Sequence, residues 1–253
     1  MKAKISLLLI FWANLVFAQS PFDLLIRQGR IIDGSGNPWF VADIGITNGK
    51  IVAIGRLEGL SAARVIEAKG LAVSPGFIDV HAHIEGGILE IPTADNFILD
   101  GVTTLVTGNC GSAEADLGKF FEQLQQKQTT PNVASLAGHN AIRRTVMQLA
   151  PRTPTPQELA QMEALMAKAM HDGAVGLSTG LIYLPGTFAN TDEIVALAKV
   201  AAQYGGVYAS HIRNESDSVH VAIAEALAEQ LKASKLIYLT ATDGLKRQGT
   251  LLR

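Results

Sequence analysis

Short runs of apolar residues separated by polar turns dominate the chain between residues 19 and 70. The runs fall at 22–26, 30–32, 41–46 and 50–55. Asn48-Gly49 separates the last two runs, and an Asn-Gly pair in that setting is a strong signal for a β-hairpin. Residues 19–70 therefore predict a small unit of β-strands ahead of the main domain.

From about residue 71, apolar runs of strand length alternate with segments of helical periodicity. The predicted strands are 72–80, 103–107, 133–137, 174–178 and 207–210, and the clearest predicted helices are 156–172, 191–204 and 216–232. Such alternation predicts a parallel sheet with crossover helices. This many units suits a (β/α)₈ barrel better than a small doubly wound domain. The predicted fold class is therefore α/β, with about five to six βα units of a TIM-like barrel over residues 71–240.

Side chains that bind metals follow three of the predicted strands. His81 and His83 end the first strand and, being two residues apart, share one of its faces. Cys110 follows the second strand and His211 follows the fifth. Active sites of such barrels form at the carboxyl ends of the strands, and imidazole and thiolate are the ligands that zinc takes. The four residues therefore predict a Zn²⁺ site, although His81 and His83 alone would also fit an ordinary surface strand end.

The composition excludes some functions and bears on the compartment. The 253 residues are 48% hydrophobic with a formal net charge of −2, which argues against nucleic acid and anionic membranes as partners. Cys110 is the single cysteine, so no disulfide can form within the chain.

The first 18 residues have the features of a secretory signal peptide. Lys2 and Lys4 precede an apolar segment at 5–17, and Ala18 completes a small-residue cleavage pattern before Gln19. We therefore expect export to the bacterial periplasm, with no membrane contact after cleavage.

Several motifs together resemble the N-acyl-D-amino-acid deacylase (D-aminoacylase) branch of the amidohydrolase superfamily. The first, Pro75-Gly76-Phe77-Ile78-Asp79-Val80-His81-Ala82-His83, is similar to the superfamily's metal motif on strand 1. The others are Gly101-Val102-Thr103-Thr104, Thr107-Gly108-Asn109-Cys110-Gly111, Gly138-His139, the segment 176–186 and Tyr208-Ala209-Ser210-His211-Ile212-Arg213-Asn214-Glu215. The resemblance covers roughly residues 22–230.

The resemblance implies a zinc-dependent hydrolysis of an N-acyl-D-amino acid to a carboxylate and a free D-amino acid, with one or two zinc ions. It implies that His81 and His83 hold one metal position, and that Cys110 and His211 contribute to the other. Many amidohydrolases bridge two metals with a carboxylated lysine after strand 4, whereas the segment here reads Ser178-Thr179-Gly180. It also implies that residues 19–70 are part of a composite β-sandwich.

Two further residues, Tyr183 and Arg213, are candidates for substrate contact. Tyr183 lies in a loop rich in proline and glycine, where binding and loop packing are equally plausible. Arg213 and Glu215 follow His211, and either they orient it or they pair with each other.

The end of the chain departs from the family pattern. The resemblance implies a further histidine on strand 6, and a general-base aspartate on strand 8 that we expect beyond the chain end. We therefore expect this chain to be C-terminally truncated and poorly active or inactive, with a divergent tail at 241–253. Three explanations of the truncation remain open: a natural short form, a frameshift and an error in the gene model. A frameshift is among them because Leu236–Thr240 can be encoded by codons that read His-Ile-Ser-His in a shifted frame.

Two alternatives to a deacylase also remain. One is another amidohydrolase, of the dihydroorotase or isoaspartyl-dipeptidase type, which would favour the strand-4 lysine. The other is a non-catalytic exported metal-binding protein. The sequence leaves the oligomeric state and the preferred D-amino acid open.

Overall fold

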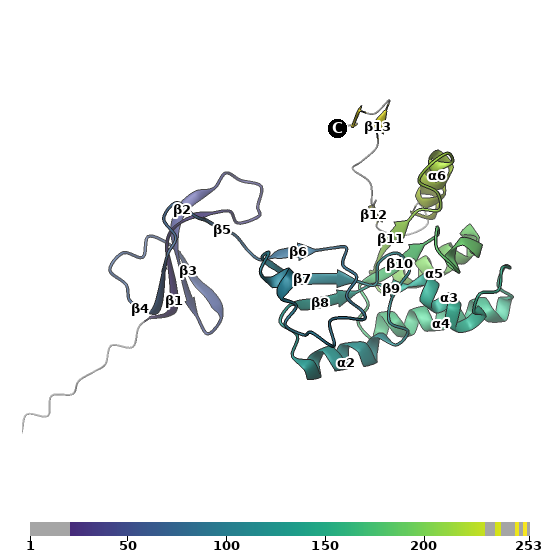
Figure 1. Cartoon of the computed structure of the whole chain (residues 1–253), viewed down its shortest axis with the longest axis horizontal. Coiled ribbons are helices and arrows are strands. Elements are labelled where there is room, and N and C mark those ends of the chain that lie inside the picture. Colours follow the sequence, from purple (N-terminus) through teal and green to yellow (C-terminus); the bar gives the residue numbers. More distant parts are fainter. Residues whose placement is uncertain (1–20, 231–235, 239–245, 248–249, 252–253) are drawn as a thin grey trace, which may run out of the picture. The chain divides into compact units, whose positions relative to one another are not determined.

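The computed structural model describes residues 21–230, 236–238, 246–247 and 250–251, and the chain divides into two compact units (Figure 1). The units are Met1–Pro75 and Gly76–Arg253. The expected signal peptide at 1–18 lies outside the described residues, as does most of the expected tail at 241–253.

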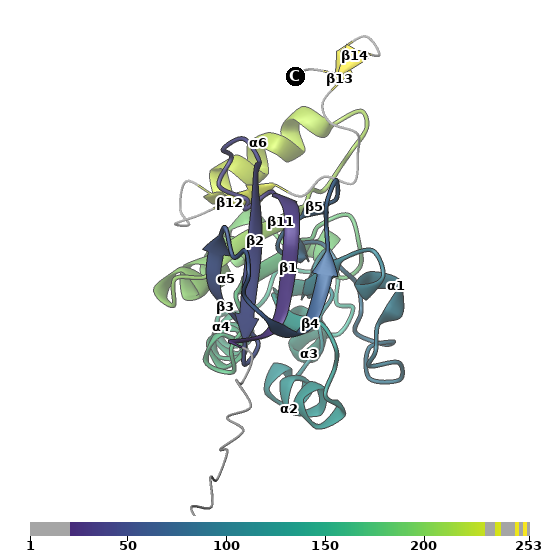
Figure 2. The same cartoon turned by 90° about the vertical axis from the view of Figure 1, so that its left-hand side faces the viewer.

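The N-terminal unit is a five-stranded sheet whose strands lie side by side in Figure 2 in the order β3-β2-β1-β4, with β5 pairing β1. Its strands are β1 (Phe22–Ile31), β2 (Phe40–Thr47), β3 (Lys50–Gly55), β4 (Ala62–Glu67) and β5 (Ala72–Val73). The predicted hairpin joins β2 to β3 in antiparallel register. Asn48 and Gly49 form its turn at φ angles of 51° and 70°, as a type I′ turn requires.

The C-terminal unit is built on parallel strands. They are β6 (Phe77–Asp79), β7 (Val102–Thr107), β8 (Asn132–Ser135), β9 (Ala137–Gly138), β10 (Gly176–Gly180), β11 (Val207–His211) and β12 (Leu236–Tyr238). They form sheets of order β6-β7-β8 and β12-β11-β10-β9, and the described strands do not close into a barrel. Phe77 and Ile78 on the edge strand β6 are exposed. The prediction of an α/β fold with an incomplete barrel is confirmed. A separate antiparallel pair joins β13 (Lys246–Arg247) to β14 (Thr250–Leu251).

Two predicted strands are each divided in the structure. The predicted strand 72–80 becomes β5 and β6, because Pro75 lies between them and has no N–H group to donate to a ladder. The predicted strand 133–137 divides at Leu136, whose N–H donates to Thr107 O at 2.9 Å. Before this residue the chain pairs with β7, and after it with β10.

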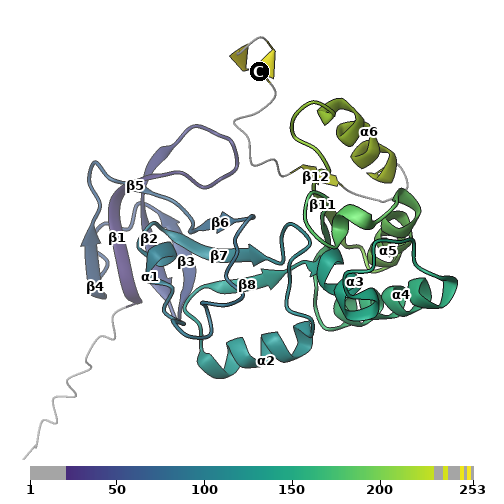
Figure 3. The same cartoon turned by 45° about the vertical axis from the view of Figure 1, so that its right-hand side comes forward.

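Helices cover the parallel strands (Figure 3). They are α1 (Asp95–Ile98), α2 (Leu117–Lys127), α3 (His139–Met147), α4 (Pro156–His171), α5 (Thr191–Gln203) and α6 (Val219–Gln230), with a 3₁₀ turn, η1, at Gly186–Phe188. The predicted capping box is present at the start of α4, where Thr155 and Glu158 bond each other's backbone N–H groups. The connection from β6 to β7 contains only the single helical turn α1 instead of a full crossover helix.

One hydrophobic core joins the helices to the strands. Met162, Met166 and Met170 form the buried face of α4, as the helical spacing predicts. They belong to the same cluster as Leu177 on β10 and Ile194 on α5. Burial of an apolar side chain of this size contributes about 1.5–3 kcal/mol. This core fixes the strands whose carboxyl ends carry the candidate metal ligands.

Among the described residues, no helix combines the length and the apolar character needed to cross a membrane.

Candidate metal centre

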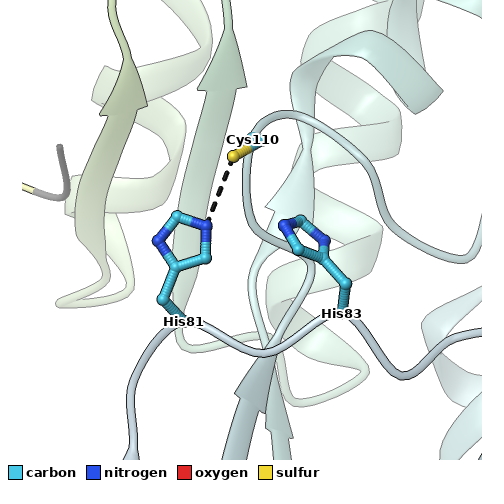
Figure 4. Close-up of side chains that lie close together, drawn as sticks. All are labelled: His81, His83 and Cys110. Carbon is cyan, nitrogen blue, oxygen red and sulfur yellow. Dashed lines mark hydrogen bonds between the residues drawn. The ribbon is translucent and has the colours of Figure 1, made fainter. Parts of the chain in front are cut away.

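The predicted ligands come together from segments that are distant in the chain. His81 and His83 lie in the segment directly after β6, Cys110 lies in the loop after β7, and His211 is the last residue of β11. Figure 4 shows the rings of His81 and His83 rising from one segment toward the Cys110 thiol. The donor atoms of these three residues all lie within 4.8 Å of one another.

The thiol of Cys110 lies between two imidazoles. Its Sγ atom is 3.4 Å from Nε2 of His81 and 3.4 Å from Nδ1 of His211. The Cys110 thiol therefore lies within reach of a metal ion held by His81 and His83 and of one held by His211.

The donor set fits zinc. Zinc bonds of about 2.3 Å to sulfur and about 2.0 Å to nitrogen, at a tetrahedral angle, place the two donors about 3.5 Å apart. The 3.4 Å separations at Cys110 agree with that value. A hydrogen bond from a thiol has the same separation, so the distance alone does not identify a metal site. The assignment to zinc rests on the residue types, which are two or three imidazoles and one thiol.

Electrostatics favour the neutral forms of His81 and Cys110 when no cation is bound. Burial lowers the pKa of His81; His83 and His211 lower it further, while Asp79 acts in the opposite direction. Burial raises the pKa of the Cys110 thiol, as do the carboxylates of Glu215 and Glu85. A bound cation would favour the thiolate, so metal binding and loss of the thiol proton are coupled.

Three carboxylates support the cluster. Asp79 Oδ1 accepts the backbone N–H of His81 at 3.0 Å, and Glu215 Oε1 lies 3.2 Å from Nε2 of His211. Of the two roles considered for Glu215, the contacts match the orientation of His211. Glu85 Oε1 accepts the N–H of Gly108 at 2.9 Å, in the loop that carries Cys110. Sequence reasoning assigned no role to Glu85, although it lies two residues after His83 on the continued i, i+2 spacing.

A cavity of about 680 Å³ adjoins the cluster. His83 and Cys110 line it together with Tyr183, Asn140 and Arg144. The Tyr183 ring meets the His211 ring edge-on, with centroids 4.8 Å apart. Burial raises the pKa of Tyr183, and Cys110 and Glu215 raise it further, so its hydroxyl is protonated at neutral pH.

Among the described residues that line this cavity, Arg144 is the one arginine or lysine, and none of them carries a carboxylate. Arg144 is exposed and donates to the Leu184 carbonyl at 3.2 Å. Sequence reasoning did not single out Arg144, because its place beside the cavity depends on how α3 packs.

Arg213 makes contacts away from the metal cluster. Its guanidinium donates to Glu225 on α6 at 2.8 Å and to the carbonyls of Thr187 and Ala189, both at 2.9 Å. These contacts join α6 to the segment around η1. A substrate contact for Arg213 stays a prediction.

His139, the strand-end histidine that was not included in the zinc prediction, belongs to a separate buried network. Its Nε2 lies 2.8 Å from Glu193 Oε1, and Arg143 donates to the other carboxylate oxygen of Glu193. All three side chains are fully enclosed. Burial alone would raise the pKa of Glu193, but the hydrogen bonds from His139 and Arg143 hold that pKa below its usual value.

Comparison with known proteins places the chain in a family. The sequence profile of the amidohydrolase family matches residues 64–242. The chain belongs to the amidohydrolase family.

Individual relatives are more specific. The chain is 38% identical over 232 residues to N-acyl-D-glutamate deacylase of Alcaligenes xylosoxydans xylosoxydans, covering 83% of this chain and 48% of the relative. The structure of N-acyl-D-glutamate deacylase from Bordetella bronchiseptica, complexed with zinc and a phosphonate inhibitor, superposes with a TM-score of 0.81 at 37% identity. That match covers 87% of this chain and 51% of the other.

A structure of D-aminoacylase, a protein described with a binuclear metal centre, has the same TM-score of 0.81 at 33% identity. It covers 86% of this chain and 51% of the other. The chain therefore spans about half the length of the relatives that it matches.

Proposed function

We propose that this chain provides metal ligands and part of the substrate cavity for hydrolysis of the amide bond of N-acyl-D-amino acids. The observation that carries the proposal is the Cys110 thiol, which lies 3.4 Å from both His81 and His211 beside a cavity of about 680 Å³. The likeness to an N-acyl-D-glutamate deacylase complexed with zinc supports the choice of metal and of substrate class.

His81, His83, Cys110 and His211 would hold one or two Zn²⁺ ions. A zinc ion in such a site polarises the scissile carbonyl and lowers the pKa of a bound water. Glu215 holds the His211 ring through Nε2, which leaves Nδ1 directed at Cys110. Asp79 fixes the backbone at His81. These contacts keep the donor atoms in place before substrate arrives.

The cavity residues fit an anionic substrate. An N-acyl-amino acid carries an α-carboxylate, and acyl glutamates and aspartates carry a second one. Arg144 supplies the positive charge at the cavity wall, and a guanidinium binds a carboxylate through paired hydrogen bonds. Tyr183, protonated at neutral pH, supplies a hydroxyl donor on the same wall.

Metal binding tests the ligand set. The purified chain, dialysed against Zn²⁺ and then against metal-free buffer, should retain at least one zinc per chain by elemental analysis. A chain that retains no zinc contradicts the proposal.

Ligand binding tests the substrate class separately from turnover. Calorimetry of the zinc-loaded chain should detect N-acetyl-D-glutamate and show much weaker binding of N-acetyl-L-glutamate. Arg144→Ala should weaken binding of the D-enantiomer. Lys199→Ala removes one exposed positive charge on α5, away from the cavity, and should leave binding unchanged. Equal binding of both enantiomers would overturn the assigned substrate class.

We also propose that the chain is exported. The proposal rests on the charged start at Lys2 and Lys4, the apolar segment at 5–17 and the small residue Ala18. Expression in a bacterium with a periplasm should give a periplasmic product that begins at Gln19 by N-terminal sequencing. A cytoplasmic product that retains Met1 would contradict export.

A further inference from the structure

The loop that carries Cys110 has an unusual backbone. Cys110 has a φ angle of 55°, in the left-handed region that non-glycine residues rarely adopt. Gly108 and Gly111, on either side, have φ angles of 75° and 72°. Such a conformation persists only where the surrounding structure holds it. The direction of the Cys110 thiol therefore depends on what fixes the loop.

Ser178 on β10 bonds this loop on both sides of Cys110. Its hydroxyl donates to the carbonyl of Gly108 and accepts the N–H of Gly111 at 2.9 Å. The Ser178 side chain is completely buried, so water does not compete for either bond. One hydroxyl thus bonds both Gly108, which is 70 positions from Ser178 in the chain, and Gly111, which is 67 positions away. Cys110 lies between these two glycines.

A neighbouring serine shows what a buried hydroxyl without this role looks like. Ser135 at the end of β8 is 1% exposed, and its hydroxyl donates to the carbonyl of the next residue, Leu136, at 2.9 Å. That bond is local and spans no loop. The pattern at Ser178 therefore goes beyond satisfying a buried polar group.

We propose that Ser178 is a positioning residue that holds the Cys110 loop in the conformation in which the thiol faces His81 and His211. This inference rests on the proposed metal site for its consequence. Its structural part, the fixing of the loop, can be measured without metal. Ser178 acts through Cys110 and touches neither the substrate nor the reacting atoms.

The first test measures the loop in metal-free protein. Ser178→Ala should raise the rate of Cys110 alkylation by iodoacetamide several-fold, because the loop loses both bonds. Ser135→Ala removes a hydroxyl of similar burial whose hydrogen bond goes to Leu136 and not to the Cys110 loop, and it should leave that rate unchanged. In the unmodified chain, hydrogen exchange at the Gly111 amide should be slow; this second measurement holds even where Ser178→Ala does not fold. Fast exchange at Gly111 or an unchanged alkylation rate overturns the inference.

The second test uses a spectroscopic signature of the metal–thiolate bond. With Co²⁺ in place of zinc, Ser178→Ala should show a weaker thiolate-to-cobalt charge-transfer band and about tenfold weaker metal affinity. Ser178→Thr, which keeps the hydroxyl, should restore both. A full-strength band in folded Ser178→Ala overturns the role in metal binding. If the unmodified chain binds no metal but Ser178→Ala alkylates faster, the proposed function fails and the positioning role stands.

Discussion

The Sγ atom of Cys110 lies 3.4 Å from Nδ1 of His211, although 101 positions separate the two residues in the chain. The fold brings them together because the loop after β7, in one parallel sheet, meets the last residue of β11, in the other. Nε2 of His81 lies at the same distance from the Cys110 thiol. The thiol is therefore the one donor that lies beside both His81 and His211 in the cluster.

Removal of the Cys110 thiol should therefore have the largest effect on metal binding. Cys110→Ala should lower zinc affinity by at least about 100-fold, since even residues that only orient ligands contribute about 10–100-fold. His171→Ala, at the exposed end of α4, removes a potential metal ligand away from the cluster and serves as the control. Competition with a fluorescent zinc chelator measures both affinities. Equal affinity of Cys110→Ala and the parent would exclude the thiol as a ligand.

The buried network of Glu193 should matter for stability. Glu193→Gln leaves the guanidinium of Arg143 enclosed without its charged partner, and breaking such a pair costs about 3–5 kcal/mol. We expect a strong fall in melting temperature, measured by circular dichroism. Glu122→Gln on the exposed face of α2 removes the same charge and should change it little. A similar small change in both variants would show that the network does not stabilise the fold.

Local sequence signals predicted the elements that local contacts determine. The β2–β3 hairpin follows from the φ angles that Asn48-Gly49 adopts without strain. The start of α4 follows from the reciprocal bonds of Thr155 and Glu158, which lie three residues apart. The spacing of two residues correctly predicted that His81 and His83 lie close together, although both lie after the end of β6 and not on the strand.

Contacts between distant segments could not be read in this way. Ser178 looked like any polar residue at a strand end, because its bonds to Gly108 and Gly111 depend on how β10 meets the loop after β7. Arg213 follows His211 in sequence, yet its partner is Glu225 on the next helix. Periodicity reports which face a residue occupies, but not which segment packs against that face.

The start of α4 gives a prediction about pH. Hydrogen bonds from Arg152 and from the N–H of Thr155 lower the pKa of Glu158 to about 2, from its ordinary value of 4.5. A carboxyl with a lowered folded-state pKa stabilises the fold above its unfolded pKa and loses that contribution as the pH falls through the folded value. Glu158→Gln should thus lower the melting temperature at neutral pH.

The difference in melting temperature between Glu158→Gln and the parent should shrink as the pH falls from about 4.5 to about 2. Below that range the two proteins should melt together, because Glu158 is then protonated in both states. Thermal melts across this range measure the difference, with Glu122→Gln as the exposed reference. A difference that stays constant between neutral and acid pH would show that the charge of Glu158 contributes nothing.

Gly180, the last residue of β10, limits the space behind Cys110. A Cβ atom at Gly180 would lie 2.0 Å from the carbonyl oxygen of Cys110, so Gly180→Ala must displace that backbone. Overpacking of this kind costs about 1–3 kcal/mol. If the cost falls on the Cys110 loop, zinc affinity decreases about 5- to 150-fold. Gly86→Ala, where a Cβ meets nothing within 4 Å, is the control and should bind zinc like the parent. Equal zinc affinity in chelator competition for Gly180→Ala and Gly86→Ala would show that the metal site tolerates movement of the Cys110 backbone.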